Sequence, residues 1–401
     1  MSAKKVEQQE QEIMFPDEVM VDLFSRLPAK SIGRFRCVSK PWKSLLSQPH
    51  FTKTRLNRIK NLQIDDEESL VILVSRDSGS LYSAQMKNAH HLVNEITVSA
   101  TELTVGDHYF DPSSIQMASC DGLILVMDEQ NKLLLINPTT REFKVLPSSP
   151  DALDPLNWGI GYDSVADDYK VVVISYYTSD YMMYVNVYSV KNNTWKRVEN
   201  CPFDHPDVEE GKSVVSINGH IYWVADVGDL SIAGFNLEEE EIYDVNFSGY
   251  VNSKDTTTTT RNSTDSDESD EPYDCSEECQ LDDLVALGGC LCFYPESTSD
   301  TCHEMFVAMK EEYDGKECWT RISFNECRSL FRPICLLGRK QKQKQMVLVM
   351  DEEDTNEKLM MYNFEEETFK DIVVNGIPES FGVGGSFMES LVSPHCSSEA
   401  V

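Results

Sequence analysis

The first sixty residues place their apolar side chains at helical spacing. Val19, Leu23 and Leu27 are four residues apart from one another, so they share one face of a helix. Pro16 and the two acids after it suit the start of this helix, and Pro28 ends it. We therefore predict a first short helix between these two prolines.

Two or three more short helices are predicted after Pro28, for a total of three or four. Ser31 and Ser39 are the expected N-cap residues of the first two, because a serine hydroxyl accepts a hydrogen bond from a free backbone N–H. The apolar residues of these helices are Ile32, Phe35, Val38, Trp42, Leu45 and Leu46. Helices this short are unstable alone, and a domain of under about fifty residues has barely enough core to fold independently. The pattern favours a small domain whose apolar face is half of an interface.

Beyond residue 60 the pattern becomes that of strands. LILVM (123–127) and LLLIN (133–137) flank a polar turn, which is typical of a hairpin. The apolar runs 171–177, 220–225 and 346–350 suit strands of a buried sheet. The chain therefore changes from helices to strands near residue 60.

A turn motif recurs through this second part. It has an apolar residue, a small polar residue, a polar turn and a bulky apolar anchor. Clear copies are INPTTREF (136–143), YSVKNNTW (188–195), FNLEEEEI (235–242) and YNFEEETF (362–369). The anchors are Ile96, Phe143, Trp195, Ile242, Trp319 and Phe369, at spacings of 47, 52, 47, 77 and 50 residues. Repeats of this length predict an all-β propeller of about six to seven blades, with an irregular β-sandwich as the alternative.

The long spacing contains an acidic low-complexity run at 251–283, and removing its 33 residues leaves 44. We predict a disordered insert there, because the run is too polar to fold alone. The fold class is thus α+β multidomain. Its predicted parts are a disordered N-terminus (1–12), a helical domain (13–58), a β domain (60–394) and a tail (395–401).

Charge is distributed unevenly along the chain. The whole chain has a formal net charge of −33, but residues 13–60 hold ten lysines and arginines against three acids. The acidic remainder repels nucleic acid. We find neither a membrane-spanning apolar run nor a secretory signal, so the twelve cysteines are expected to be reduced thiols and the protein cytoplasmic and/or nuclear.

The helical part resembles an F-box. The resemblance rests on the order Phe15-Pro16-Asp17-Glu18, Leu27-Pro28-Ala29-Lys30 and Arg36-Cys37-Val38-Ser39-Lys40-Pro41-Trp42. F-boxes dock on the small acidic Skp-type adaptor of cullin-RING ubiquitin ligases. The resemblance therefore implies an apolar adaptor-binding set that is rimmed by cations. Its members are Phe15, Pro16, Leu23, Leu27, Pro28, Ile32, Val38 and Trp42. The alternative for each residue is packing within the small domain.

The β part resembles the F-box-associated, kelch-like domain of plant F-box proteins. NPTTREFKVLP (137–147), GYDSVADDYKVV (161–172), VYSVKNNTWKRV (187–198) and NGHIYWVA (218–225) carry this resemblance. It implies the substrate receptor of a Skp-cullin-F-box ligase, with cullin and RING subunits reached through the adaptor. The protein target would be bound for ubiquitination and degradation. Target contacts are expected on loops, with candidates near 151–158, 178–182 and 204–211.

Two other functions stay open. One is a non-degradative F-box scaffold or inhibitor, and the other is a propeller that binds or converts a small molecule. The second would need convergent carboxylates at the central channel. We find no phosphate-binding glycine loop or nucleophile elbow. Cys275, Cys279, Cys290, Cys292 and His303 have spacings that fit no structural zinc site, so neither metal nor cofactor is expected.

Overall fold

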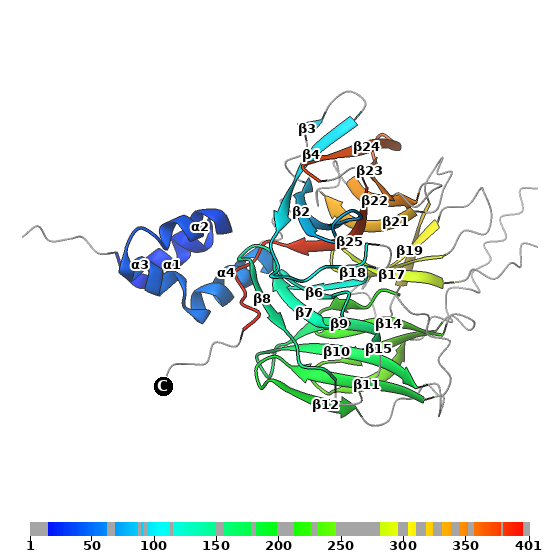
Figure 1. Ribbon diagram of the computed structural model, residues 1–401, viewed down its shortest axis with the longest axis horizontal. Helices are drawn as coiled ribbons and strands as arrows, with labels where there is room; N and C mark the ends of the chain where they lie inside the picture. The colour runs from blue at the N-terminus through cyan, green and yellow to red at the C-terminus, as the bar shows by residue number, and fades with distance from the viewer. Residues whose placement is uncertain are drawn as a thin grey trace, which may run out of the picture.

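The computed structural model describes most of the two predicted parts. Described are residues 15–61, 69–86, 90–91, 95–112, 115–149, 155–177, 182–198, 212–226, 231–245, 281–295, 304–309, 318–323, 331–337, 345–351, 357–377 and 380–395. The predicted N-terminus (1–12), residues 251–280 of the predicted insert and residues 396–401 of the predicted tail lie outside these ranges. Figure 1 shows the helices gathered at one end of the molecule and the strands at the other.

Four short helices form the N-terminal part: α1 (Asp17–Ser25), α2 (Ala29–Phe35), α3 (Lys40–Leu46) and α4 (Pro49–Asn61). The predicted cap at Ser39 is confirmed, because its hydroxyl accepts a hydrogen bond from the Trp42 N–H at 3.3 Å. The predicted cap at Ser31 is wrong. Pro28 is the N-cap of α2 and Ser31 lies inside the helix, because the fixed φ of proline already suits a helix start.

The described strands form four four-stranded sheets and one nine-stranded sheet. The nine-stranded sheet divides, at a parallel pairing of β24 with β4, into two further four-stranded units. We call the six units blades 1 to 6, each given from its inner to its outer strand.

Blade 1 is β25 (Phe381–Met388), β1 (Ser69–Ser75), β2 (Leu81–Gln85) and β4 (Glu95–Leu103), with β3 (His90–His91) beside β4; blade 2 is β5 (Met117–Cys120), β6 (Leu123–Met127), β7 (Leu133–Asn137) and β8 (Glu142–Val145); blade 3 is β9 (Pro155–Asp163), β10 (Asp168–Tyr177), β11 (Met182–Ser189) and β12 (Thr194–Val198). Blade 4 is β13 (Val215–Ile217), β14 (His220–Asp226), β15 (Ser231–Asn236) and β16 (Glu241–Val245); blade 5 is β17 (Leu281–Leu287), β18 (Cys290–Pro295), β19 (Glu304–Met309) and β20 (Cys318–Ser323); blade 6 is β21 (Phe331–Leu337), β22 (Gln345–Asp351), β23 (Glu357–Asn363) and β24 (Thr368–Asn375).

The blades close into a ring. Their inner strands contact one another in the order β25, β5, β9, β13, β17, β21 and back to β25. The C-terminal strand β25 pairs with β1, so strands from both ends of the β domain share blade 1 (Figure 1). Six blades around one axis confirm the predicted β-propeller rather than the β-sandwich.

The core of the β domain lies between neighbouring blades. Each adjacent pair of blades buries one cluster of apolar side chains. Between blades 3 and 4, for example, Val172, Ile221, Trp223 and Phe235 are fully buried. Both faces of strands such as β6 and β7 are therefore buried, which explains the continuous apolar runs LILVM and LLLIN in the sequence.

In blades 2, 3, 4 and 6 the recurring sequence motif forms the turn before the outer strand. In blade 2 the Asn137 side chain accepts hydrogen bonds from the N–H groups of Thr139 (2.8 Å) and Thr140 (3.1 Å). Arg141 then takes a positive φ of 63°, and Phe143 is the second residue of β8. Such side-chain-to-backbone bonds are why asparagine favours turns. The other predicted anchors are likewise second in their outer strands: Ile96 in β4, Trp195 in β12, Ile242 in β16, Trp319 in β20 and Phe369 in β24.

The predicted insert is too long at its C-terminal end. Residues 281–283 belong to β17, and Asp283 is buried. Its carboxylate accepts hydrogen bonds from the Ser213 N–H and hydroxyl, both at 2.7 Å, and from the Tyr294 hydroxyl at 3.2 Å. Asp283 was assigned to the insert because it follows an acidic run. Its partners, Tyr294 on β18 and Ser213 just before β13, are distant in the sequence and gave no local signal. No helix in the described ranges has the length and apolar run needed to cross a bilayer.

Candidate functional site: the exposed face of the helical domain

The helical domain has a small core of its own. Phe24, Ile32, Leu46 and Phe51 are buried together in it. Ile32 has 0 % exposed surface, so it packs inside the domain and corrects its assignment to the adaptor-binding set. The physical reason is that a helix this short has one inward face, and Ile32 lies on it. This set therefore reduces to seven residues.

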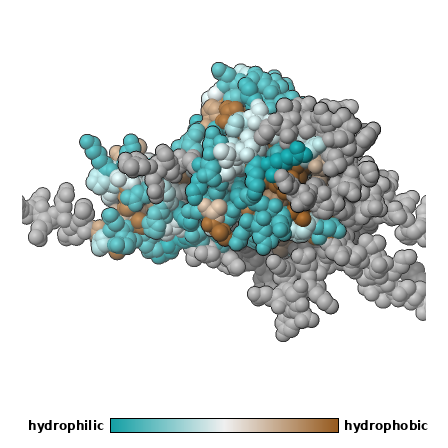
Figure 2. All heavy atoms as spheres, turned by 90° about the horizontal axis from the view of Figure 1, so that it is seen from below, coloured by the Kyte–Doolittle hydropathy of each residue, from teal (hydrophilic) through white to brown (hydrophobic). Residues whose placement is uncertain are grey.

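Five of the seven residues are exposed. Phe15 is 58 % exposed, Leu23 52 % and Val38 63 %, and Pro16 and Pro28 are also exposed. Figure 2 shows hydrophobic surface among hydrophilic residues at the helical end of the molecule. Exposed apolar side chains of this size, concentrated on one small domain, are typical of a protein-binding surface.

Leu27 and Trp42 are half-buried and pack against the core. The Trp42 ring lies 5.0 Å from the Phe24 ring and 5.6 Å from the Phe35 ring, both in edge-to-face geometry. Trp42 therefore supports the domain from inside and still presents part of its surface. Both readings of this residue, packing and partner contact, are compatible with its position.

Val19 was not included in the sequence-based set, but it is 43 % exposed and lies one turn before Leu23 on α1. The i, i+4 spacing of Val19 and Leu23 was the signal that identified it. We add it, and we use the name adaptor face for the predicted adaptor-binding surface made of Phe15, Pro16, Val19, Leu23, Leu27, Pro28, Val38 and Trp42.

Cations accompany this face. Lys30, Arg34, Lys40 and Lys43 are exposed. Arg36, the fifth cation of the segment, is engaged within the domain, where its Nη2 and Nε donate to the Leu46 carbonyl at 2.6 and 3.2 Å. Four of the five positive charges are thus free of this structural role and available to an acidic partner.

An ion-pair group joins α1 to α4. Asp22 accepts hydrogen bonds from Arg58 at 2.7 Å and Arg26 at 2.8 Å. The hydrogen bond from Arg58, followed by that from Arg26, holds the pKa of the Asp22 carboxyl below its usual value. Asp22 therefore stays ionised at neutral pH and cross-links the two helices.

The centre of the propeller holds a cavity of about 100 Å³. Its described lining comes from β5, the region of β13, β17, β18, β21 and β25, and includes Ser119, Tyr294 and Arg332 but no carboxylate, histidine or cysteine. The Arg332 side chain is engaged, since it donates to the Val383 carbonyl at 2.7 Å. This lining does not provide the paired carboxylates that glycoside hydrolysis needs.

The cysteines of β18 are packing residues. Cys290 and Cys292 both pack in the cluster between blades 5 and 6, and burial raises the pKa of Cys292 to about 12. Among the described residues, no group of three or more histidines, cysteines and acids is placed to hold a metal ion. Cys275, Cys279 and His303 lie outside the described ranges.

The candidate target loops are mostly outside the described ranges as well. Of the segment 151–158, residues 155–158 belong to β9, where Asn157 and Trp158 are buried. Residues 178–181 and 204–211 are not described. The strands that flank these segments end away from the helices, since Lys53 of α4 contacts Asp167 in the opposite turn of blade 3. The target loops stay a prediction.

Comparison with known proteins gives the same two parts. Residues 14–54 match the F-box domain, and residues 69–393 match the F-box associated beta propeller domain. F-box protein CPR1 of Arabidopsis thaliana is 27 % identical over 404 residues, which cover 91 % of this chain and 86 % of that protein. F-box/kelch-repeat protein At3g23880 of the same plant is 28 % identical over 239 residues, covering 56 % of this chain and 63 % of that protein.

Among solved structures, oligogalacturonate lyase from Vibrio parahaemolyticus aligns with 75 % of this chain and 78 % of its own, at a TM-score of 0.38 and 9 % identity. A likeness this low carries no argument about function. The two matched domains, in contrast, cover almost all the described residues. The chain belongs to the family of F-box proteins with an F-box associated beta propeller domain.

Proposed function

We propose that this protein is the substrate-recognition subunit of a Skp-cullin-F-box ubiquitin ligase. The F-box would bind a Skp-type adaptor, and through it the cullin and RING subunits, while the propeller would hold a target protein. The observation that carries this proposal is the adaptor face, where Val19, Leu23 and Val38 are exposed beside free cations. A folded domain keeps such side chains in water only at a cost, which a partner removes.

The proposed role is non-catalytic. The receptor holds its target near the ubiquitin-loaded conjugating enzyme, and the rate gain comes from a higher effective concentration. In support, the relatives with matching domains are F-box proteins. We also propose that the protein acts in the cytoplasm and/or the nucleus. The free thiols at Cys37, Cys120, Cys290 and Cys292 suit a reducing compartment, and imaging a fluorescent fusion would test this.

The direct test is calorimetric titration of the full chain with a purified Skp-type adaptor. Leu23→Asp and Val38→Asp place a charge in the proposed interface, and we expect each to weaken binding by about 2 kcal/mol or more, as for an interface anchor. Val373→Asp is the matched control, because Val373 is 41 % exposed on β24 of blade 6. Wild-type affinity in both F-box variants, or no binding by the wild type, would refute the proposal.

These point variants are better tests than removal of residues 1–60. Such a truncation also deletes Arg55 and Leu56 of α4, which are buried at the junction with the propeller. A truncated chain would therefore combine loss of the adaptor face with damage to the β domain. The single substitutions alter the surface of the F-box alone.

Target turnover separates the proposed ligase subunit from a scaffold or inhibitor. Targets would be captured by cross-linking in cells and then offered to the reconstituted ligase. Ubiquitin transfer that stops with Leu23→Asp is the expected result. A captured protein that binds the propeller but is never ubiquitinated, and has an unchanged half-life when the receptor is removed, would favour the scaffold.

A further inference from the structure

The C-terminal residues 389–392, which we call the strap, lie between the F-box and blade 2. They follow β25 directly and run past the helices in Figure 1. The propeller holds the strap by hydrogen bonds: the buried Asn137 side chain donates to the Val392 carbonyl at 2.6 Å, and the Ser390 N–H donates to the Thr139 hydroxyl at 3.4 Å. The strap is thus a fixed part of the β domain.

Glu389 of the strap completes the N-terminus of helix α2. The N-cap Pro28 offers no side-chain cap, and the first turn of α2 contains no acid. Glu389 takes the place of both the side-chain cap and the first-turn acid, since its Oε1 accepts a hydrogen bond from the Ala29 N–H at 3.0 Å. A carboxylate at this position satisfies a free donor and interacts favourably with the helix dipole.

The second carboxylate oxygen of Glu389 faces a buried cation. Arg55 of α4 lies 3.5 Å from it, and the Arg55 side chain is only 5 % exposed. Arg55 also donates from Nε to the Leu27 carbonyl at 3.4 Å. Two charged groups therefore contact residues 27–29: Arg55 of α4 contacts Leu27, and Glu389 of the strap contacts Ala29.

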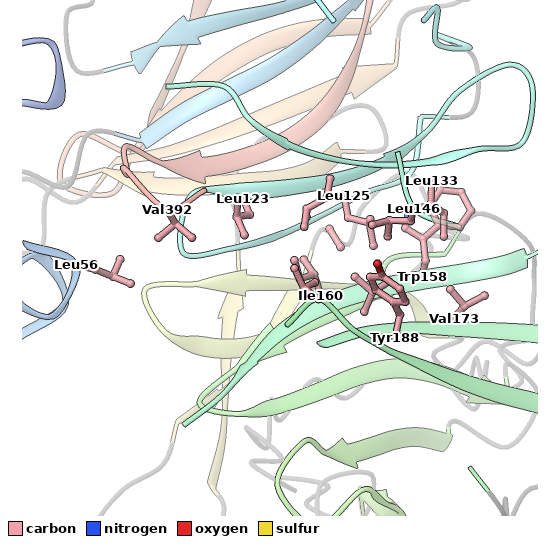
Figure 3. Close-up of a cluster of buried hydrophobic side chains, with 14 residues drawn as sticks. Leu56, Leu123, Leu125, Leu133, Leu146, Trp158, Ile160, Val173, Tyr188 and Val392 are labelled. Carbon is pink, nitrogen blue, oxygen red and sulfur yellow. The ribbon is translucent and has the colours of Figure 1, made fainter. Parts of the chain in front are cut away.

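Apolar side chains are exchanged across the same junction. Leu391 of the strap is partly buried and packs against the F-box core cluster. Leu56 of α4 packs in the cluster of blades 2 and 3, and Figure 3 shows it on the side of Val392 and Leu123. Each domain thus contributes one side chain to the core of the other, so the F-box is complete only when the strap is in place.

We propose that the strap is a positioning element for the adaptor face, with Glu389 as its central residue. Leu27 and Pro28 of that face directly precede Ala29, so a free α2 N-terminus would loosen them. The strap also fixes the orientation of the F-box relative to the propeller, and hence of a target relative to the adaptor. The expected effect of the strap on adaptor binding rests on the proposed function, whereas its expected effect on the F-box itself does not.

The test compares hydrogen exchange and adaptor affinity in full-chain variants. For Glu389→Ala we expect amide exchange in peptides covering residues 27–32 to become about tenfold faster and adaptor binding to weaken about fivefold. Glu389→Gln keeps an oxygen for the Ala29 N–H but loses the charge that faces Arg55. It should give smaller changes in the same direction, and it serves as the test if the alanine variant fails to fold.

Two controls separate positioning from loss of stability. Glu238→Ala removes an exposed acid in the turn before β16 and should change neither readout. Leu103→Ala removes a buried side chain of blade 1 and should lower the melting temperature without altering exchange at 27–32 or adaptor affinity.

Unchanged exchange in both Glu389 variants would overturn the proposal. Faster exchange with unchanged affinity would overturn the positioning role, and so would an equal loss of affinity in Leu103→Ala. Absence of adaptor binding by the wild type would refute the proposed function instead, and the exchange data would still show whether the strap supports the F-box.

Discussion

Leu23 and Ile32 are similar side chains in one small domain, but they differ in exposure. Leu23 is 52 % exposed and Ile32 is fully buried. We expect Ile32→Ala to destabilise the F-box by about 2–5 kcal/mol, because it leaves a cavity in the core. Leu23→Ala should leave thermal unfolding within about 0.5 kcal/mol of wild type and should weaken adaptor binding. Calorimetry of both variants checks the pair, and equal stability losses would contradict it.

Lys170 is the buried cation that joins blades 3 and 4. Its ammonium group contacts Asp163 at 2.9 Å, Glu240 at 2.8 Å and the Leu237 carbonyl at 2.7 Å. Lys170→Met keeps the length of the side chain but leaves Asp163 and the half-buried Glu240 without this partner. We expect a loss of about 3 kcal/mol, the lower end for a broken buried ion pair, because Glu240 keeps Lys196. Urea denaturation measures this loss, and a variant as stable as the wild type would contradict it.

The same group of charges predicts a pH dependence. Burial acts to raise the pKa of Asp163 and of Glu240, but hydrogen bonds, including those from Lys170, outweigh it, so both pKa values are lowered. A carboxyl whose pKa is lower in the folded than in the unfolded protein stabilises the fold at pH values above its unfolded-state pKa. This stabilisation is lost as the pH falls and the carboxyl of the folded protein becomes protonated. The stability difference between wild type and Lys170→Met should therefore shrink between about pH 5 and pH 3. A constant difference over this range would contradict the assignment.

At the scale of elements, the outer strands could be predicted from the sequence because the turns before them are formed by local hydrogen bonds. The motif around Asn137 marks a local hydrogen-bonded turn, and Asn236 also accepts from two backbone N–H groups, those of Glu238 and Glu239. Such bonds span two or three residues, so the turn appears as a short recurring sequence motif that predicts where each outer strand begins. The short helices were also predictable from i, i+4 spacing and prolines.

Contacts between distant segments were not predictable in the same way. Glu389 reaches Ala29 across 360 positions, and β24 pairs with β4 although both are outer strands. No periodic sequence pattern marks either contact, because both contacts depend on how the ring of blades closes. The burial of Ile32 was missed for a related reason: an amphipathic pattern gives the apolar face of a helix but not whether a partner or the domain's own core covers it.

One of two comparable hairpin glycines, Gly122, lies close to the strap. Gly122 and Gly219 are each the second residue of a two-residue turn, with φ of 80° and 81°. A Cβ at Gly122 would lie 2.5 Å from the Ser390 Cβ and 2.6 Å from the Met388 carbonyl oxygen, whereas at Gly219 the nearest atom is 4.0 Å away. Both substitutions to alanine strain the turn, but only Gly122→Ala also pushes on the strap.

We therefore expect Gly219→Ala to cost about 1 kcal/mol of stability, the lower end of the cost for such a backbone position. Gly122→Ala should cost at least about 1 kcal/mol more, as overpacking does. Only Gly122→Ala should speed hydrogen exchange in the F-box. Chemical denaturation with exchange mass spectrometry measures both effects. Equal stability and equal F-box protection in the two variants would show that the turn at Gly122 does not support the strap.

At the scale of the whole molecule, charge is divided between the two domains. Residues 13–60 have ten cations and three acids, while the chain as a whole has a net charge of −33. An acidic adaptor is thus repelled by the propeller and attracted by the F-box. Because charges are screened beyond about 8 Å at physiological salt, the nearby cations at Lys40 and Lys43 should dominate the final approach.

This balance predicts different salt responses in two chains. The association rate constant of the wild type with the adaptor should fall as salt rises, because salt screens an attraction. The double variant Lys40→Glu with Lys43→Glu should associate about tenfold more slowly at low salt, and its rate should fall less steeply with salt, because the F-box keeps a smaller positive charge. Stopped-flow measurements over a sodium chloride series give both slopes. Lys132→Glu with Lys370→Glu changes the net charge equally on the propeller. If that control slows association as much as the F-box variant does, overall charge rather than the F-box cations steers the adaptor.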